Sequence, residues 1–333
     1  MNPTVTIVMP VYNTEDLVER AIHSVLSQSY RNFELIIIDD ASTDNSLSAV
    51  HSALQDAVPE IRSKVRVIAR DKNQGYASAT NTGVGMARGE WIWFVDGDDW
   101  AEPEMLQRIL DAAREHSAEI VMTRMRRVRL ATGTGKVLSE WAPRNSVSTG
   151  REALKRLARG ELLAFQTNKL IARGLWEGIV SPCNTYSDAA IMPELLRRAR
   201  RVAFVKEPLY NYCRRSESVT GSLRPSAWDL TALPDFIFPV LNDVFPTRTA
   251  HALQKHFVYS VVYSSLINGS ASDGGQSGLA KEVHAWTRDR IRWSDLFWFA
   301  ARGRFTLAAS LGLAKAAPQL HRQVLGYYKR VTP

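Results

Sequence analysis

The stretch WIWFVDGDDW, residues 91–100, places three carboxylates directly after a run of apolar residues. The first five residues have the length and the β-rich composition of a buried strand. Asp96, Asp98 and Asp99 then gather at one spot, where carboxylates at close range repel one another. A group of opposite charge is therefore expected to bind at the end of this strand.

Further short apolar runs precede and follow this strand, at residues 4–9, 33–39, 65–69 and 119–123. Segments with helical spacing separate them; Thr14 is predicted to cap the first helix, and Pro103 to begin a later one. Alternation of strands and helices predicts an α/β domain with a mainly parallel sheet covered by helices. The last third of the chain is predicted to be mainly helical.

Charge is unevenly distributed along the 333 residues. Residues 1–120 carry 10 Lys and Arg against 19 Asp and Glu, a net charge of −9, which leaves 32 against 15, or +17, for residues 121–333. A basic half favours an anionic partner, which is a nucleic acid, a membrane surface or a phosphate-bearing substrate. A merely solvated basic surface fits the same count.

Several classes of protein are disfavoured. The two cysteines, Cys183 and Cys213, form no metal-binding or disulfide pattern, so a reducing cytoplasm is the expected compartment. The N-terminus resembles a strand rather than a signal peptide. No window of 18 uncharged apolar residues predicts a membrane-spanning helix.

Three polar clusters follow predicted strands, at residues 10–13, 39–44 and 96–99. Ligands of open parallel sheets bind at the carboxyl ends of the strands, so these clusters are expected to converge. Asp39 and Asp44 taken alone have an equally good explanation as turn or helix-capping residues. Convergence of all three clusters favours a binding site.

The order of motifs resembles glycosyltransferase family 2. The motifs are IVMPVYN (7–13), IIIDDASTDNS (36–46) and NQGYASATNTGVGMARGEWIWFVDGDDW (73–100), with weaker similarity over 166–178 and 186–222. This resemblance implies a GT-A fold over residues 1–222, with a nucleotide-binding part at 1–125 and an acceptor-side part at 126–222. Residues 223–333 would then form a separate helical region.

The resemblance also implies roles for individual residues. The acid matching Asp40 would bond the base, usually uracil, because a carboxylate accepts the imide N–H. Thr80 departs from the pattern, since many relatives have Arg there. The residues assigned to the nucleotide and its sugar are Pro10, Tyr12, Asn13, Asp40, Asn73, Gly75, Asn81, Asp96 and Arg214.

A divalent cation is the implied partner of the three carboxylates. Asp98 would ligate Mg²⁺ or Mn²⁺, Asp96 would touch the ribose, the metal or a metal-bound water, and Asp99 would support the loop or the sugar. Such a cation stabilises the charge that grows on a diphosphate leaving group. The alternative is an acidic turn that caps the helix beginning near Pro103.

Asp188 is the implied general base, which would take the proton of the acceptor hydroxyl. The family has a Glu-Asp pair here, whereas this chain has Ser187 before Asp188, and Ser-Asp is also a good helix start. Lys169 is a further candidate for donor, acceptor or phosphate contact, and Arg214 for the diphosphate.

The expected function is therefore inverting, metal-dependent transfer of a sugar from a UDP-sugar to a surface-glycan or lipid-linked acceptor. A sugar nucleotidyltransferase is an alternative, although no Gly-rich phosphate-binding signature follows the first strand. A glycosyltransferase-like module that binds nucleotide or glycan without turnover is another. No nucleic acid is expected as a partner. The basic segment 319–333 is a candidate for peripheral membrane contact, and a packing helix with a solvated basic face fits it equally well.

Overall fold

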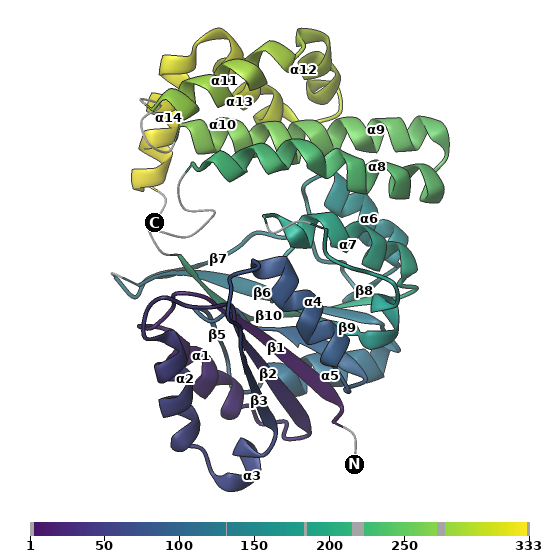
Figure 1. Cartoon of the computed structure of the whole chain (residues 1–333). Helices are drawn as coiled ribbons and strands as arrows, with labels where there is room; N and C mark the ends of the chain where they lie inside the picture. Colours follow the sequence, from purple (N-terminus) through teal and green to yellow (C-terminus); the bar gives the residue numbers. More distant parts are fainter. Residues whose placement is uncertain (1–2, 131, 183–184, 215–222, 272–276, 332–333) are drawn as a thin grey trace. The chain divides into compact units, whose positions relative to one another are not determined.

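The computed structural model describes residues 3–130, 132–182, 185–214, 223–271 and 277–331. The chain divides into two compact units, each considered by itself (Figure 1). The first comprises Met1–Leu157 and Glu161–Arg214, and the second comprises Ala158–Gly160 and Arg215–Pro333. Cys183, one of the two cysteines, lies outside the described residues.

The first unit is built on one sheet whose strands follow the order β3-β2-β1-β4-β9-β6-β10-β5, with β7 beside β6 and β8 beside β10. Their bounds are β1 (Val5–Val11), β2 (Phe33–Asp39), β3 (Val65–Ala69), β4 (Trp91–Phe94), β5 (Trp100–Ala101), β6 (Ile120–Arg129), β7 (Gly135–Val137), β8 (Val147–Ser148), β9 (Lys169–Ala172) and β10 (Val202–Arg214).

The sheet changes from parallel to mixed strand directions at β4. The four strands β3, β2, β1 and β4 are all parallel, as expected from their continuous apolar sequences. Beyond them β9 is antiparallel to both β4 and β6, while β10 pairs parallel with β6 and antiparallel with β5. The prediction of a mainly parallel sheet is thus right for the first half of the domain, and the second half is mixed.

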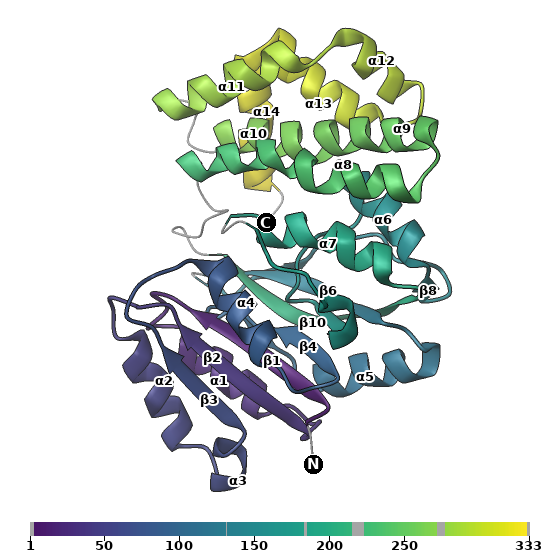
Figure 2. The ribbon, with the colours of Figure 1, turned by 45° about the vertical axis from the view of Figure 1, so that its right-hand side comes forward.

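Helices cover both faces of this sheet (Figures 1 and 2). Side chains alternate along β1, so Ile7 and Met9 join the core under α1, α2 and α5, whereas Val8 points to α4. The helices are α1 (Val18–Leu26), α2 (Ser46–Gln55), α3 (Pro59–Arg62), α4 (Tyr76–Met86), α5 (Met105–His116), α6 (Gly150–Ala158), the 3₁₀ turn η1 (Arg173–Trp176) and α7 (Ser187–Arg198).

The prediction that Thr14 caps the first helix was wrong. Helix α1 begins at Val18, and the backbone oxygen of Thr14 accepts the N–H groups of Leu17 and Val18 in the preceding turn. The Thr14 side chain is buried instead of exposed at a helix end. The later helix begins at Met105, two residues after Pro103.

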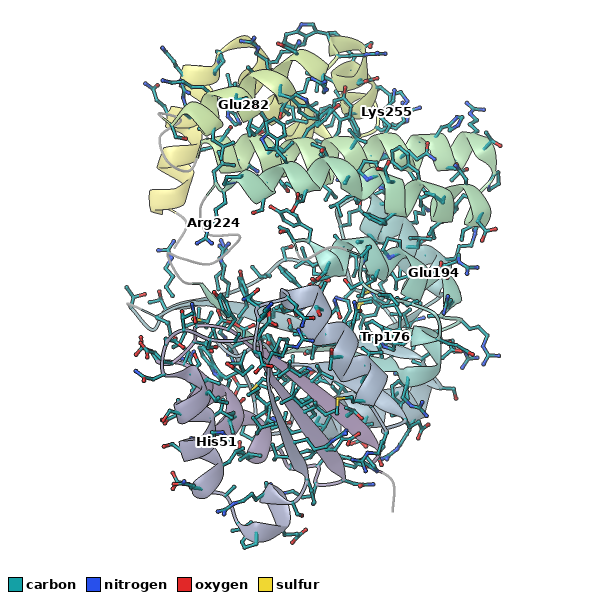
Figure 3. All side chains as sticks on the ribbon, in the orientation of Figure 1. His51, Trp176, Glu194, Arg224, Lys255 and Glu282 are labelled. Atoms are coloured by element: carbon teal, nitrogen blue, oxygen red, sulfur yellow. The ribbon has the colours of Figure 1, made fainter. Side chains whose placement is uncertain are left out.

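The elements described in the second unit are all helical. Its elements are η2 (Pro225–Ala232), α8 (Leu233–Val244), α9 (Thr247–Phe257), η3 (Val258–Tyr263), α10 (Ser264–Ser270), α11 (Gly278–Arg290), α12 (Trp293–Ala300), α13 (Phe305–Ala316) and α14 (Pro318–Val331). Leu296, Phe299 and Leu311 form its core with Tyr259 and Ile267. Lys255 (Figure 3) pairs with Asp295 at 2.6 Å. None of the described helices is both long and apolar enough to cross a bilayer.

Two glycines of α4 should respond oppositely to substitution by alanine. A Cβ at Gly83 would lie 2.3 Å from Cγ1 of Val8, whereas a Cβ at Gly85 would meet no atom within 4 Å. We expect Gly83→Ala to reduce the free energy of unfolding by about 1–3 kcal/mol through overpacking. Gly85→Ala should increase it by about 0.5–1 kcal/mol through helix propensity. Urea denaturation measures both, and equal effects would contradict close packing of α4 on β1.

Candidate active site

The three polar clusters converge at one edge of the sheet. The adjacent parallel strands β2, β1 and β4 end at Asp39, Val11 and Phe94, so the loops that follow them start side by side. The edge formed by carboxyl ends of parallel strands is where open α/β sheets bind ligands.

The carboxylates after β4 form a tight cluster. One oxygen from each of Asp96, Asp98 and Asp99 can be chosen so that all three atoms lie within 4.8 Å of one another. Burial, together with the negative charges of Asp98 and Asp188, raises the pKa of Asp96 to about 8. Burial and its two neighbours also raise the pKa of Asp99 well above its ordinary value. Three oxygen donors whose charges repel fit a hard divalent cation such as Mg²⁺ or Mn²⁺.

Both carboxylate oxygens of Asp99 accept hydrogen bonds from other residues of the protein. Its side chain is fully buried, its Oδ2 accepts the Tyr210 hydroxyl at 2.8 Å, and its Oδ1 accepts the Cys213 N–H at 2.7 Å. Both donors belong to β10, so Asp99 ties the acidic loop to that strand. Of the two roles predicted for Asp99, this geometry favours support of the loop.

Asp96 and Asp98 are only partly buried. The Tyr76 hydroxyl, at the start of α4, donates to Oδ1 of Asp96 at 2.9 Å, and the Asp96 N–H donates to the Tyr210 oxygen at 3.2 Å. Arg20 donates to the backbone oxygen of Asp98 at 3.1 Å and stacks on Trp100. The two tyrosines were missed by the sequence analysis, since no local pattern marks a tyrosine as the partner of a distant carboxylate.

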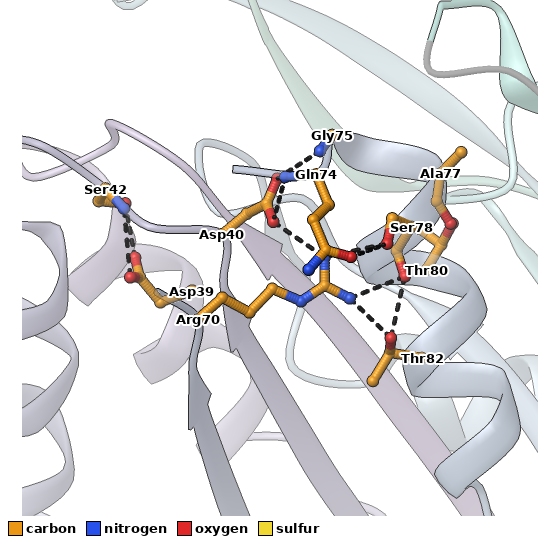
Figure 4. Close-up of polar contacts among 10 residues, drawn as sticks. All are labelled: Asp39, Asp40, Ser42, Arg70, Gln74, Gly75, Ala77, Ser78, Thr80 and Thr82. Atoms are coloured by element: carbon orange, nitrogen blue, oxygen red, sulfur yellow. Dashed lines mark hydrogen bonds and ion pairs between the residues drawn. The ribbon is translucent and has the colours of Figure 1, made fainter. Parts of the chain in front are cut away.

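Asp40 is engaged by three donors (Figure 4). Its carboxylate pairs with Arg70 at 2.9 Å and accepts the N–H groups of Gln74 and Gly75, the latter at 2.7 Å. Gly75 has φ 87°, a conformation that favours glycine, and it immediately precedes α4. Arg70 also bonds Thr82 in α4 at 2.6 Å. Asp40 therefore holds the start of α4, and its contact with a base stays a prediction.

The other residues assigned to the nucleotide lie around the same loops. Pro10 is buried in β1, Tyr12 is 46% exposed, and Asn73 is exposed. Asn13, with φ 51°, accepts the Thr43 N–H and so links the loops after β1 and β2. Asp44 accepts the N–H groups of Ser46 and Glu15 from the position before the N-cap residue of α2, which is Asn45.

Asn81 and Thr80 take inward positions on α4. The Asn81 side chain accepts the Ser181 N–H at 2.8 Å and donates to the Ser181 backbone oxygen at 3.1 Å. These two bonds fix Ser181, in the segment before α7, to α4. Thr80 is buried and bonds the Ala77 oxygen, so this position packs inside the domain.

Asp188 lies near the acidic cluster although the two are 90 positions apart in the chain. It is the second residue of α7, and its charge contributes to the raised pKa values of both Asp96 and Tyr76. Burial raises the pKa of Asp188 itself, while the Gln166 N–H at 3.4 Å and the positive charge of Lys169 oppose that rise. A carboxylate with a raised pKa beside a cation site suits a general base.

Lys169 is a buried residue that shapes the loop before β9. Its Nζ donates to the backbone oxygens of Leu163 and Phe165 and to Oδ1 of Asn168, at 2.6–3.0 Å. This loop carries Gln166, whose N–H reaches Asp188. Lys169 therefore holds the conformation of this loop, and its contact with a ligand stays a prediction. Arg214 ends β10, and its side chain lies outside the described residues.

Comparison with known proteins identifies relatives over most of the chain. The model of the family "Glycosyl transferase family 2" matches residues 6–179. Glycosyltransferase GlyG of Streptococcus pneumoniae is 28% identical over 277 residues, which are 80% of this chain and 87% of that protein. The succinoglycan biosynthesis protein ExoO of Rhizobium meliloti is 38% identical over 138 residues, or 41% of this chain and 38% of that one.

Solved structures show the same fold at low sequence identity. Residues 1–349 of Staphylococcus aureus TarS, in complex with UDP-GlcNAc, superpose with a TM-score of 0.70 at 17% identity, covering 98% of this chain and 92% of that one. The mannosyltransferase PcManGT of Pyrobaculum calidifontis, in complex with GDP-Man and Mn²⁺, gives 0.52 at 15% identity, covering 98% and 87%. The chain therefore belongs to glycosyltransferase family 2 and has a GT-A fold followed by a helical region.

Proposed function

We propose that this glycosyltransferase moves a hexosyl or N-acetylhexosaminyl group, with inversion, from a UDP-sugar to a hydroxyl of a cell-wall or surface glycan or of a lipid-linked acceptor. The observation that carries the proposal is the acidic cluster of Asp96, Asp98 and Asp99 with Asp188 close enough to perturb it. One group of carboxylates would hold the leaving group through a cation, and a separate carboxylate would accept the proton.

The donor would lie over the carboxyl ends of β1, β2 and β4. Asp98 and Asp96 would hold Mg²⁺ or Mn²⁺, which when bound neutralises charge on the departing diphosphate. Pro10, Tyr12, Asn13, Asp40 and Asn73 are proposed around the nucleotide, with Gly75, Asn81 and Arg214 towards the sugar and diphosphate. A uridine donor is supported by the TarS complex with UDP-GlcNAc, and a manganese ion by the PcManGT complex.

The chemical step needs one proton acceptor. The acceptor's hydroxyl oxygen forms a bond to the anomeric carbon while the bond from that carbon to the diphosphate oxygen breaks. The hydroxyl proton passes to Asp188, and the nucleoside diphosphate leaves with the bonding electron pair. Because burial raises the pKa of Asp188 above the ordinary 3.8, the carboxylate is a better base than one in water.

The setting of the reaction is also part of the proposal. We assign the enzyme to the cytoplasm, where the buried, unpaired Cys213 would stay reduced. A lipid-linked acceptor would require contact with the inner face of the membrane, and the basic end of α14 is one candidate for that contact. The side chains after Leu325 lie outside the described residues.

Asp98→Asn should remove metal-dependent stabilisation by nucleotide. UDP with Mn²⁺ at 100 times its dissociation constant should stabilise the wild type by about 2.7 kcal/mol, whereas the variant should gain little. Thermal unfolding with UDP, with and without Mn²⁺, measures the difference. Asp56→Asn, at an exposed position at the end of α2, is the matched control. Equal stabilisation of both variants by every nucleotide and metal would show that the cation site is wrongly assigned.

Asp188→Asn should lower kcat by about 10²–10⁴-fold while leaving UDP and Mn²⁺ binding unchanged. In the wild type the acidic limb of the pH–rate profile should lie above pH 3.8, since the pKa of Asp188 is raised and the base must be ionised. The exposed Glu177, changed to Gln, is the control. Release of UDP in the presence of acceptor measures turnover. Wild-type kcat in Asp188→Asn would exclude this base.

Tyr76→Phe should weaken Mn²⁺ binding by about 10–100-fold, because Asp96 loses the hydroxyl that orients it. Titration of Mn²⁺ in the presence of UDP, followed by calorimetry, measures the affinity without any turnover. Tyr30→Phe, away from the acidic cluster, should bind like the wild type. If Tyr76→Phe bound Mn²⁺ as tightly as the wild type, the Tyr76 hydroxyl would not be required to orient Asp96.

A further inference from the structure

Helices α12 and α13 of the second unit expose large aromatic side chains to solvent. Phe297 is 72% exposed, Phe305 is 66% exposed, and Trp293 is 49% exposed. Trp293 and Phe297 lie one turn apart on α12, and Phe305 is the first residue of α13. The three side chains lie within 13 positions of one another. Exposed large apolar side chains clustered in this way are unusual on helices that contact only water.

These side chains belong to one surface, which we call the aromatic face. Phe305, Ala309, Gly312 and Ala316 follow one another by four, three and four positions, so they share one side of α13. A Cβ built on Gly312 would lie 3.5 Å from the buried Leu296 and 3.7 Å from the half-exposed ring of Trp293, so that side of α13 packs on α12 beside Trp293. The aromatic face therefore extends across both helices.

The aromatic face is uncharged at its centre and flanked by cations. Residues 305–314 contain no charged side chain, and the exposed Arg292 and Arg302 stand just before and just after α12. Asp295, the acidic residue of α12, is directed away and bonds Lys255 and Tyr259 at 2.6 and 2.7 Å. Over residues 288–333 the sequence has nine Lys and Arg against two Asp.

We propose that the aromatic face docks this protein on an anionic lipid bilayer. Aromatic rings enter the boundary between headgroups and acyl chains, while arginines extend to the phosphates. Each basic residue near an anionic surface adds attraction. A second copy of the chain is a poorer occupant, because a two-fold interface places the same patch against itself and would bring these cations together.

Co-sedimentation of the full chain with lipid vesicles tests the proposal. Vesicles contain phosphatidylcholine alone or mixed equally with phosphatidylglycerol, at about 0.1 M and about 0.5 M salt. We expect binding to the anionic vesicles that weakens with salt. Phe297→Ser should reduce the partition coefficient by about tenfold or more. Arg292→Gln and Arg302→Gln should each reduce it by about fivefold.

Val180→Ser is the matched control, because Val180 is 69% exposed and belongs to the first unit. Circular dichroism should show unchanged melting for Phe297→Ser, whose side chain is mostly in solvent. Absence of binding to anionic vesicles, or an equal loss in Val180→Ser and Phe297→Ser, would overturn the proposal. The proposal would also be overturned if the wild type sedimented as a dimer, and if Phe297→Ser dissociated that dimer but still bound vesicles. None of these results bears on sugar transfer.

Discussion

Repulsion between carboxylates at the end of β4 is the constraint on which the site depends. Asp96 and Asp99 are desolvated and lie beside Asp98, so their ionised forms are costly. Within the described chain, the hydrogen bonds that reach the Asp96 and Asp99 carboxylates come from uncharged groups, two tyrosine hydroxyls and one backbone N–H. Such donors fix the orientation of the carboxylates but carry no positive charge, so a bound cation would relieve the repulsion that they leave.

The charge of the neighbouring Asp40, in contrast, is balanced by a cationic side chain of the protein. Arg70 balances its charge, and two backbone N–H groups orient it (Figure 4). Helix α4 joins the two clusters, since its preceding Gly75 bonds Asp40 and its first residue, Tyr76, bonds Asp96. Close packing of Gly83 on Val8 places that helix against β1. A shift of α4 would therefore disturb both clusters together.

The candidate base is held by a different part of the chain. Lys169 is buried among the backbone oxygens of its own loop, and that loop presents the Gln166 N–H to Asp188. Burying a lysine is costly unless its three donor positions are used, and here three acceptors meet them. Lys169 was a candidate for contact with donor, acceptor or phosphate; the structure directs its three donors to its own loop, and contact with a ligand stays a prediction.

The sequence by itself determined the strands β1 to β4, the convergence of three polar loops and the family. These depend on local features: apolar runs of strand length, turn residues after them and an ordered set of motifs. Only the tertiary structure decided which partners each acid has. Tyr210 and Cys213 meet Asp99 from more than 110 positions away, and α7 brings Asp188 to Asp96. Such pairings arise from the register of β10 and the packing of helices. A local sequence pattern specifies the conformation of its own segment, but it does not specify how far that segment lies from another one.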